Sequence, residues 1–302
     1  MSGPRGVAVA PLRAPPPRGS RPSPIEAAEN ATIVDREDVS TAVARFVVRP
    51  DGPIAPFVAG QYLALGLRVD GRIVQRPYSA AACPRTAQAH EFLVRLVPDG
   101  VLTPHLWRAT TGTRVRLGPP KGIFVLEPDD PRAHLFVSSG TGLAPFVSMV
   151  RALAGRDRPP RIVVVHGVSH AADLAERARL EAWARDGLIT YVPTVSRPDD
   201  PASVGWRGRV GRTEAALTDV CGELTLDPAA TVAYLCGNPG MVEGAERVLR
   251  DRGFGDVRAE RFWGPGAAGR GAAGPSVALR GAAIVGAAIV GAALHGAGSA
   301  AA

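Results

Sequence analysis

The chain has 302 residues, of which 46% are hydrophobic and 21% charged, a length that allows two domains and a composition typical of a globular enzyme. The formal net charge is +7, but six arginines lie in the first 25 residues and after residue 263, two segments that contain no acid. The middle of the chain is therefore close to neutral, which excludes nucleic-acid binding by a folded core.

The cysteine content excludes two further classes. Cys83, Cys221 and Cys236 are widely spaced, with no C-x-x-C pair and no metal-ligand spacing. An iron–sulfur cluster within the chain would need about four thiolates. An odd, low count is more typical of a reducing cytoplasm than of a disulfide scaffold. The N-terminal residues lack an uninterrupted apolar segment, so no signal peptide is predicted and we expect a cytoplasmic protein.

Residues 1–29 are rich in proline, arginine and alanine and are predicted to be disordered. Residues 30–127 then carry short β-rich runs separated by glycine and proline, with one helical stretch near residues 103–108. The clearest of these runs are Val43–Val48, Phe92–Val97, Arg114–Leu117 and Ile123–Leu126. This spacing predicts a first domain that is a closed antiparallel β-barrel.

A β-hairpin is predicted within this domain. The alternating run Tyr62–Leu67 is followed by a turn at Asp70-Gly71 and then by the tetrapeptide Arg76-Pro77-Tyr78-Ser79. An arginine can neutralise a phosphate, a tyrosine offers a flat face to an aromatic ring, and a serine offers one hydroxyl. By itself the tetrapeptide also fits an ordinary surface strand. It indicates a binding site only in combination with motifs further along the chain.

The segment from Gly100 to Thr103 leads into the predicted barrel helix, where free N–H groups could meet a phosphate. After a proline-bounded joint at Glu127–Pro131, the pattern changes to alternating strands and helices. Strands are predicted over residues 135–137, 162–165, 189–195, 232–235 and 257–262. Helices are predicted over residues 144–153 and 171–184 and near Thr213 and Met241. The alternation predicts a second, α/β domain over residues 132–263, with a parallel doubly wound sheet.

Two glycine-containing loops of this second domain are candidate nucleotide sites. Gly140-Thr141-Gly142 lies between a predicted buried strand and a helix, where backbone N–H groups could hold a pyrophosphate. Cys236-Gly237-Asn238 follows a later strand in the same way, where a small thiol could lie against a planar ring. The alternatives are a tight turn and a buried structural cysteine. Two such loops at one sheet edge favour a dinucleotide.

Arg197 and Arg209 could pair with a phosphate, although exposed arginines are common in this chain. Residues 264–302 are dominated by glycine and alanine and contain the near repeat Gly281–Val285 and Gly286–Val290. The segment is long enough for a membrane span, but it is weakly apolar and glycine-rich. We favour a low-complexity tail and keep membrane contact as the alternative.

In this order, the barrel, Arg76–Ser79, Gly140–Gly142 and Cys236–Pro239 resemble ferredoxin–NADP reductases. The resemblance covers about residues 30–263. The ending Ala259-Glu260-Arg261-Phe262-Trp263 is similar to the Ala-Glu-x-Tyr-Trp ending of bacterial members of the flavodoxin type.

The resemblance implies FAD on the barrel and NADP on the α/β domain. Arg76 would hold the FAD pyrophosphate, Tyr78 would stack on the isoalloxazine, and Ser79 would lie near its N5. The complete cofactor-binding set is Arg76, Pro77, Tyr78, Ser79, Gly100, Val101, Leu102, Thr103, Gly140, Thr141, Gly142, Arg197, Arg209, Cys236, Gly237, Asn238, Met241 and Trp263. The catalytic set would be Ser79, Cys236 and Glu260, with no metal. Arg197 and Arg209 match the positions that grip the 2′-phosphate.

Two departures from the family pattern bear on these roles. Ser169 stands where many bacterial members have an arginine, which weakens the expected preference for NADP over NAD. The chain also continues past Trp263, so the role of an aromatic ending in shielding the flavin stays open.

The resemblance therefore implies an enzyme that passes electrons between NADPH and a ferredoxin or flavodoxin-like carrier by hydride transfer to flavin N5. One alternative is the reductase component of an oxygenase or hydroxylase, NADH-linked in one version. An alternative of another class is a non-catalytic, flavin-binding redox sensor. We expect a monomer.

Overall fold

The computed structural model describes residues 29–127, 129–154, 156 and 158–262. The predicted C-terminal tail, Trp263 and all but residue 29 of the predicted N-terminal tail lie outside the described residues. Among the helices that the structure describes, none is long and apolar enough to cross a membrane.

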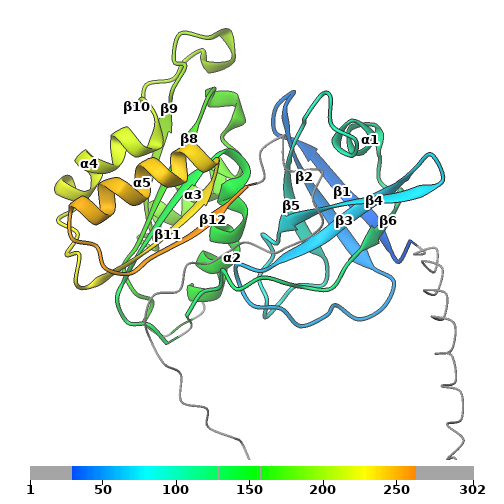
Figure 1. The fold of residues 1–302 in the computed structure, drawn as a ribbon, viewed down its shortest axis with the longest axis horizontal. Helices are drawn as coiled ribbons and strands as arrows, with labels where there is room; N and C mark the ends of the chain where they lie inside the picture. Colours follow the sequence, from blue (N-terminus) through cyan, green and yellow to red (C-terminus); the bar gives the residue numbers. More distant parts are fainter. Residues whose placement is uncertain (1–28, 128, 155, 157, 263–302) are drawn as a thin grey trace, which may run out of the picture. The chain divides into compact units, whose positions relative to one another are not determined.

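The N-terminal half contains six strands joined in antiparallel order β4-β3-β6-β1-β2-β5 (Figure 1). These are β1 (Ala31–Asp38), β2 (Val43–Pro50), β3 (Tyr62–Val69), β4 (Arg72–Ser79), β5 (His90–Arg95) and β6 (Arg114–Leu117), with helix α1 (Thr103–Arg108) between the last two. The two ends of the sheet meet where the amide of Ala81, just after β4, donates to the carbonyl of Glu91 in β5 (2.8 Å). The predicted antiparallel barrel is confirmed.

The β3–β4 hairpin turns at Asp70 and Gly71, whose φ angles of 49° and 78° are left-handed. Aspartate and glycine tolerate this conformation, which suits the twist of a two-residue hairpin turn. The eight-residue register that follows pairs Tyr62 with Ser79. The hairpin therefore brings Ser79 to the end of a regular ladder.

The predicted strand Ile123–Leu126 is wrong. Gly122, the residue before this segment, has a left-handed φ of +109°, Ile123 is 68% exposed, and the residues that follow have no strand partner among the described residues. Beyond it, the side chains of Phe124 and Leu126 enter the core that surrounds helix α2 of the second domain. The segment is apolar because it packs against that core, and apolar composition alone does not distinguish such a segment from a strand.

The second half contains six parallel strands in the order β10-β9-β8-β7-β11-β12. The strands are β7 (Ala133–Ser139), β8 (Ile162–Val168), β9 (Thr190–Val195), β10 (Arg209–Val210), β11 (Thr231–Gly237) and β12 (Val257–Arg261). The helices are α2 (Ala144–Leu153), α3 (Arg177–Arg185), α4 (Thr213–Glu223) and α5 (Pro239–Asp251), with 3₁₀ turns η1 (Gly140–Leu143), η2 (Ala171–Asp173) and η3 (Pro201–Ser203). The predicted parallel doubly wound sheet is confirmed.

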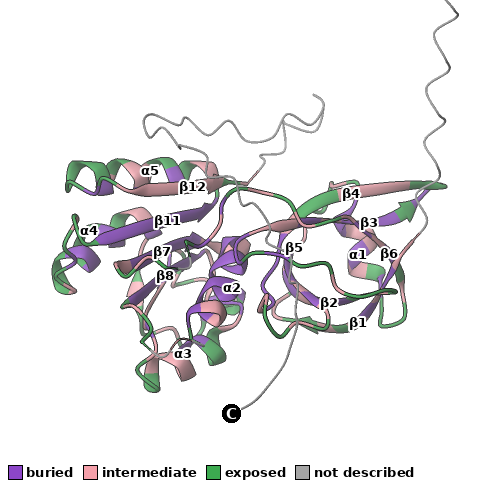
Figure 2. Cartoon of the chain, turned by 90° about the horizontal axis from the view of Figure 1, so that it is seen from below, coloured by how far each residue is buried: buried purple, intermediate pink, exposed green. Residues whose placement is uncertain are grey.

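Alternate residues of the central strands face opposite helical layers, as period-two side chains must. Phe136 and Val164 pack with α2 and α3, whereas Val137 and Val163 pack with α4 and α5. Figure 2 shows the buried central strands β7, β8 and β11 in this sheet. Near-continuous apolar strands are what a sheet buried on both faces requires.

The helix predicted over residues 171–184 is interrupted. Glu176 has a left-handed φ of 58° and precedes α3, while residues 171–173 form only a 3₁₀ turn. The break coincides with contacts to the barrel: Ser40 Oγ donates to Asp173 (2.7 Å), and Glu176 lies 4.0 Å from Arg45. These partners lie more than 130 residues away in the chain, so no local pattern could reveal them.

Candidate functional site

Strand β4 carries the tetrapeptide at an end of the barrel sheet, since β3 is its only ladder partner in the described part of the chain. This position accommodates Pro77, which lacks an N–H to donate. Arg76 is exposed, and its guanidinium donates only to the neighbouring carbonyl of Gln75 (2.8 Å) among the described contacts. Tyr78 is half-buried edge-on against Phe92, with ring centroids 6.4 Å apart. Burial raises the pKa of Tyr78 to about 12, so the phenol stays neutral.

Three side chains predicted as catalytic come together although they lie on three different strands. The Ser79 hydroxyl, from β4, donates to Glu260 Oε2 of β12 at 3.5 Å. Glu260 pairs with Cys236 in the β11–β12 register. The structure thus joins the end of a barrel strand to the carboxyl edge of the parallel sheet.

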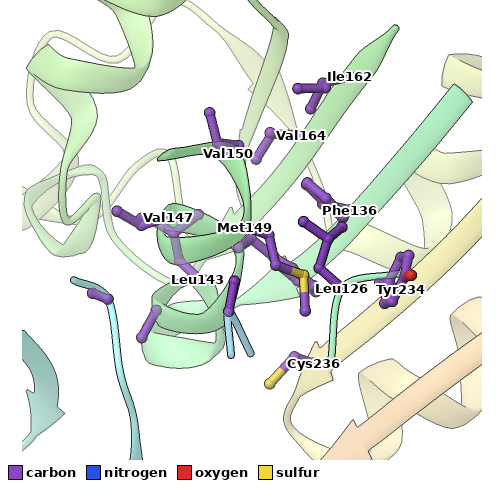
Figure 3. Close-up of a cluster of buried hydrophobic side chains, with 14 of the residues drawn as sticks. Leu126, Phe136, Leu143, Val147, Met149, Val150, Ile162, Val164, Tyr234 and Cys236 are labelled. Carbon is purple, nitrogen blue, oxygen red and sulfur yellow. The ribbon is translucent and has the colours of Figure 1, made fainter. Parts of the chain in front are cut away.

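Burial controls the charge of this cluster. Cys236 is fully buried, which raises the pKa of its thiol well above the usual value, and Glu260 adds to the rise. Burial also raises the pKa of Glu260 to about 7, although the hydrogen bond from Ser79 opposes it. Figure 3 shows Cys236 at the edge of the apolar cluster that contains Tyr234 of the same strand. The cluster therefore holds a neutral thiol and a carboxyl group that can gain or lose a proton near neutral pH.

The two glycine loops are in contact. A Cβ at Gly142 would lie 2.3 Å from the carbonyl oxygen of Cys236, so only glycine fits there. Ser139 Oγ accepts from the amide of Asn238 (2.9 Å), and Asn238 caps α5 by accepting from Gly240 N (2.9 Å). The loops follow β7 and β11, the neighbouring strands at which the strand order reverses. This is where doubly wound sheets bind dinucleotides, beside free helical N–H groups.

A residue that received no role from the sequence supports the first loop. His166 of β8 is fully buried, with Nε2 3.0 Å from the carbonyl oxygen of Gly140 and Nδ1 3.4 Å from the Tyr191 hydroxyl. Burial lowers the pKa of His166 to about 4, so the ring is neutral at physiological pH. A carbonyl can only accept, so Nε2 carries the proton. A polar residue in the apolar strand Ile162–Val168 was the signal that could have found it.

Three predicted contacts are held inside the fold. Leu102 lies in the barrel core, and Met241 packs in the core of α4 and α5. Thr103 Oγ1 donates to the Val97 carbonyl and accepts from the Val97 amide, both at 2.9 Å. These bonds also explain why β5 ends at Arg95, before the predicted Val97. The side chains of Leu102 and Thr103 are therefore not available to a ligand, and these two residues could contact one only through their backbone. The side chain of Val101 remains available, since it is 57% exposed.

The two candidate 2′-phosphate arginines differ. Arg197 is exposed, and its side chain makes no ion pair or hydrogen bond that is seen within the described part of the chain. Arg209 donates to Glu223 Oε2 at 2.6 Å. Trp263 lies outside the described residues, so its predicted contact stays a prediction.

The residues present fit a flavin and a nicotinamide dinucleotide. The exposed Arg76 has no acid partner among the described residues and shares strand β4 with the aromatic Tyr78. Gly142 allows a close backbone approach that any Cβ would fill. The antiparallel barrel carries this edge strand, and the parallel sheet carries glycine loops where its strand order reverses. Together they define the class of two-domain, nucleotide-dependent flavoprotein oxidoreductases.

Comparison with known proteins identifies the family within this class. The oxidoreductase FAD-binding domain matches residues 30–126, and the oxidoreductase NAD-binding domain matches residues 136–247. Ferredoxin–NADP reductase B of Sorangium cellulosum is 33% identical over 206 residues, which span 67% of this chain and 82% of that protein. The chain belongs to the ferredoxin–NADP reductase family and is an FAD-dependent oxidoreductase. The predicted cofactors are confirmed as FAD and a nicotinamide dinucleotide.

Oxygenase reductases are also similar. The anthranilate 1,2-dioxygenase electron transfer component of Acinetobacter baylyi is 31% identical over 210 residues, or 68% of this chain and 58% of that protein. The crystal structure of the Amycolatopsis reductase GcoB has a TM-score of 0.67 and 31% identity, covering 77% of this chain and 69% of that one.

Proposed function

We propose that this flavoenzyme oxidises NADPH and passes the electrons to a small, separate carrier of the ferredoxin or flavodoxin type. The observation that carries the proposal is the meeting of Ser79, Cys236 and Glu260, because it joins the flavin strand to the dinucleotide loops. Bound FAD supplies the chemistry of hydride acceptance and single-electron release. The side chains supply position, charge and exclusion of water.

On the barrel, Arg76 would bind the pyrophosphate, because its guanidinium is exposed and unpaired with any acid in the described residues. Tyr78 would pack its ring against the isoalloxazine, and Ser79 would direct its hydroxyl toward the flavin edge. The neutral Tyr78 phenol adds no charge beside the ring system.

On the parallel sheet, backbone N–H groups of the Gly140–Gly142 turn would bind the dinucleotide pyrophosphate. Cys236 would offer a small, neutral surface beside the nicotinamide, since burial keeps its thiol protonated. Glu260 would orient the Ser79 hydroxyl and hold a proton whose presence depends on pH near 7.

NADPH is proposed over NADH because Arg197, just after the end of β9, has an exposed guanidinium that could bind the 2′-phosphate. Its backbone amide donates to the carbonyl of Ser169 (2.9 Å), the position at which many bacterial relatives have a further arginine. The preference should therefore be moderate.

The second candidate function is an oxygenase reductase component, favoured by the similarity to the Acinetobacter protein. With only three cysteines the chain cannot hold an iron–sulfur cluster on about four thiolates, so this function would also need a separate carrier. We propose that the protein is a monomer. We also propose a cytoplasmic location, which the free thiols of Cys83, Cys221 and Cys236 support.

The test is steady-state reduction of a dye, and of ferredoxin and flavodoxin, with NADPH and NADH side by side. Faster reduction with NADPH and transfer to a carrier would support the proposal. Equal or faster reduction with NADH would favour the oxygenase-type alternative. Yellow protein that neither coenzyme bleaches under anaerobic conditions would indicate the redox sensor.

A further inference from the structure

Arg209 is held by two acids of helix α4. Its guanidinium donates to Glu223 Oε2 at 2.6 Å and lies 3.7 Å from Asp219 Oδ2. The two acids are one helical turn apart and face the same side, with side chains 55% and 65% exposed. The hydrogen bond with Glu223 raises the pKa of Arg209 above its usual value. The positive charge of this arginine is thus already partly neutralised.

The backbone of Arg209 is fixed, so only its side chain can change partner. Arg209 pairs with Thr194 in the β9–β10 ladder, and its carbonyl accepts from Trp206 Nε1 at 3.0 Å. Gly208 lies so close to the Trp206 ring that a Cβ there would approach it to 2.4 Å. A ligand that recruits Arg209 must therefore take the guanidinium away from the acids without moving the strand.

Arg197 provides the contrast within the same pair of strands. It follows the end of β9, the strand that pairs with β10, and its exposed side chain has no ion-pair partner within the described ranges. Of the two arginines predicted to bind the 2′-phosphate, Arg197 has no acid partner among the described residues, whereas Arg209 is paired with Glu223.

We propose that Glu223, assisted by Asp219, is a specificity-determining residue that competes with the 2′-phosphate of NADPH for Arg209. The inference rests on the proposed NADPH site. A phosphate monoester carries more negative charge than a carboxylate and accepts two parallel bonds from a guanidinium, so it can displace an exposed ion pair. The displaced pair is a cost that NADH, which lacks the 2′-phosphate, does not incur. Glu223 therefore reduces the preference for NADPH over NADH. Ser169, which replaces an arginine found in many bacterial relatives, reduces the same preference.

The experiment measures binding of adenosine 2′,5′-bisphosphate and of 5′-AMP to the full-length holoenzyme by calorimetry, without turnover. Glu223→Gln should bind the bisphosphate about two- to fivefold more tightly, the range expected for an exposed ion pair, with 5′-AMP unchanged. Arg209→Ala should weaken only the bisphosphate. In the Arg209→Ala background, Glu223→Gln should have no further effect.

The matched control is Asp51→Asn, which removes one acid that pairs with Arg114 on the barrel. It changes the net charge equally and should leave both affinities unchanged. If Glu223→Gln leaves bisphosphate binding unaltered or weaker while Arg209→Ala still weakens it, Glu223 does not compete with the 2′-phosphate. The role of Arg209 in binding the phosphate would then stand. Full bisphosphate affinity in Arg209→Ala would overturn the inference and the 2′-phosphate contact predicted for Arg209 from the sequence, and would leave the proposed NADPH preference to Arg197. Glu223 is exposed at the end of α4, and an unchanged flavin spectrum verifies that the variant folds.

Discussion

At the scale of single residues, environment decides chemistry. Glu260 and Cys236 have ordinary side chains, but burial raises the pKa of the first to about 7 and the pKa of the second well above its usual value. The exposed Arg76 keeps its charge free for a ligand, whereas Arg209 shares its charge with Glu223.

Arg76→Ala should lose FAD. A charge-assisted phosphate contact is typically worth about 1.5–3 kcal/mol, which corresponds to roughly 10- to 150-fold in affinity. The flavin content of the purified variant, measured from its visible absorbance, gives the answer. The control is Arg72→Ala on the same strand, which should retain flavin. Full occupancy in Arg76→Ala would remove this arginine from the site.

Glu260 should make stability depend on pH. Its folded-state pKa of about 7 lies above the usual value of 4.5, so folding favours the protonated form. The favourable contribution is complete below about pH 4.5 and is lost as pH rises through 7, a change on the order of 3 kcal/mol. Glu260→Gln cannot ionise and should lack this loss. Denaturant unfolding of both proteins at several pH values measures it, and parallel pH profiles would contradict the assignment.

At the scale of elements, the dinucleotide turn η1 depends on the strands beside it. Its residues are held by His166 of β8 through the Gly140 carbonyl and by close contact of Gly142 with the end of β11. The turn is therefore shaped by tertiary contacts, and its glycines alone do not determine its conformation.

His166→Leu should raise the KM for NADPH and for NADH alike, by about tenfold, since the partly buried Gly140 carbonyl loses its donor and the pyrophosphate is common to both coenzymes. His166→Gln, whose amide can donate to the same carbonyl, should recover part of the loss. Flavin content should stay constant in both variants. An effect confined to NADPH, or equal defects in the two variants, would show that His166 does not act through this hydrogen bond.

At the scale of the whole molecule, helix α2 connects the barrel to the parallel sheet. Arg151 donates to the Ala81 carbonyl (2.9 Å) and to Glu91 Oε1 (2.7 Å), and Ser148 Oγ donates to the Ala82 carbonyl (2.7 Å). The Arg151 and Glu91 side chains are only 13% and 20% exposed. The site depends on this joint, because Ser79 and Glu260 belong to the two sides that it connects.

Arg151→Ala should lower the free energy of unfolding by about 2 kcal/mol, because the Ala81 carbonyl loses its donor and the half-buried Glu91 keeps only the more distant Arg45, at 3.6 Å. Arg250→Ala removes an exposed partner of Glu246 and should cost less than about 1 kcal/mol. Denaturant unfolding of the two variants makes the comparison. Equal losses would show that the Arg151 contacts are no stronger than a surface pair.

Local sequence patterns predict the barrel, the parallel sheet, the β3–β4 hairpin and the positions of the two glycine loops. These follow from local rules: period-two strands, left-handed turn residues such as Gly71, and glycine where a strand meets a helix. Contacts between distant parts of the chain are needed to explain why Ile123–Leu126 packs without forming a strand, why Glu176 interrupts a helix, and why Leu102 and Met241 lie in cores. The hydrogen bond from His166 to the Gly140 carbonyl and the ion pair between Glu223 and Arg209 likewise cannot be predicted from local sequence. Each of these depends on a partner distant in the chain, and burial, charge and hydrogen bonding exist only once that partner is in place.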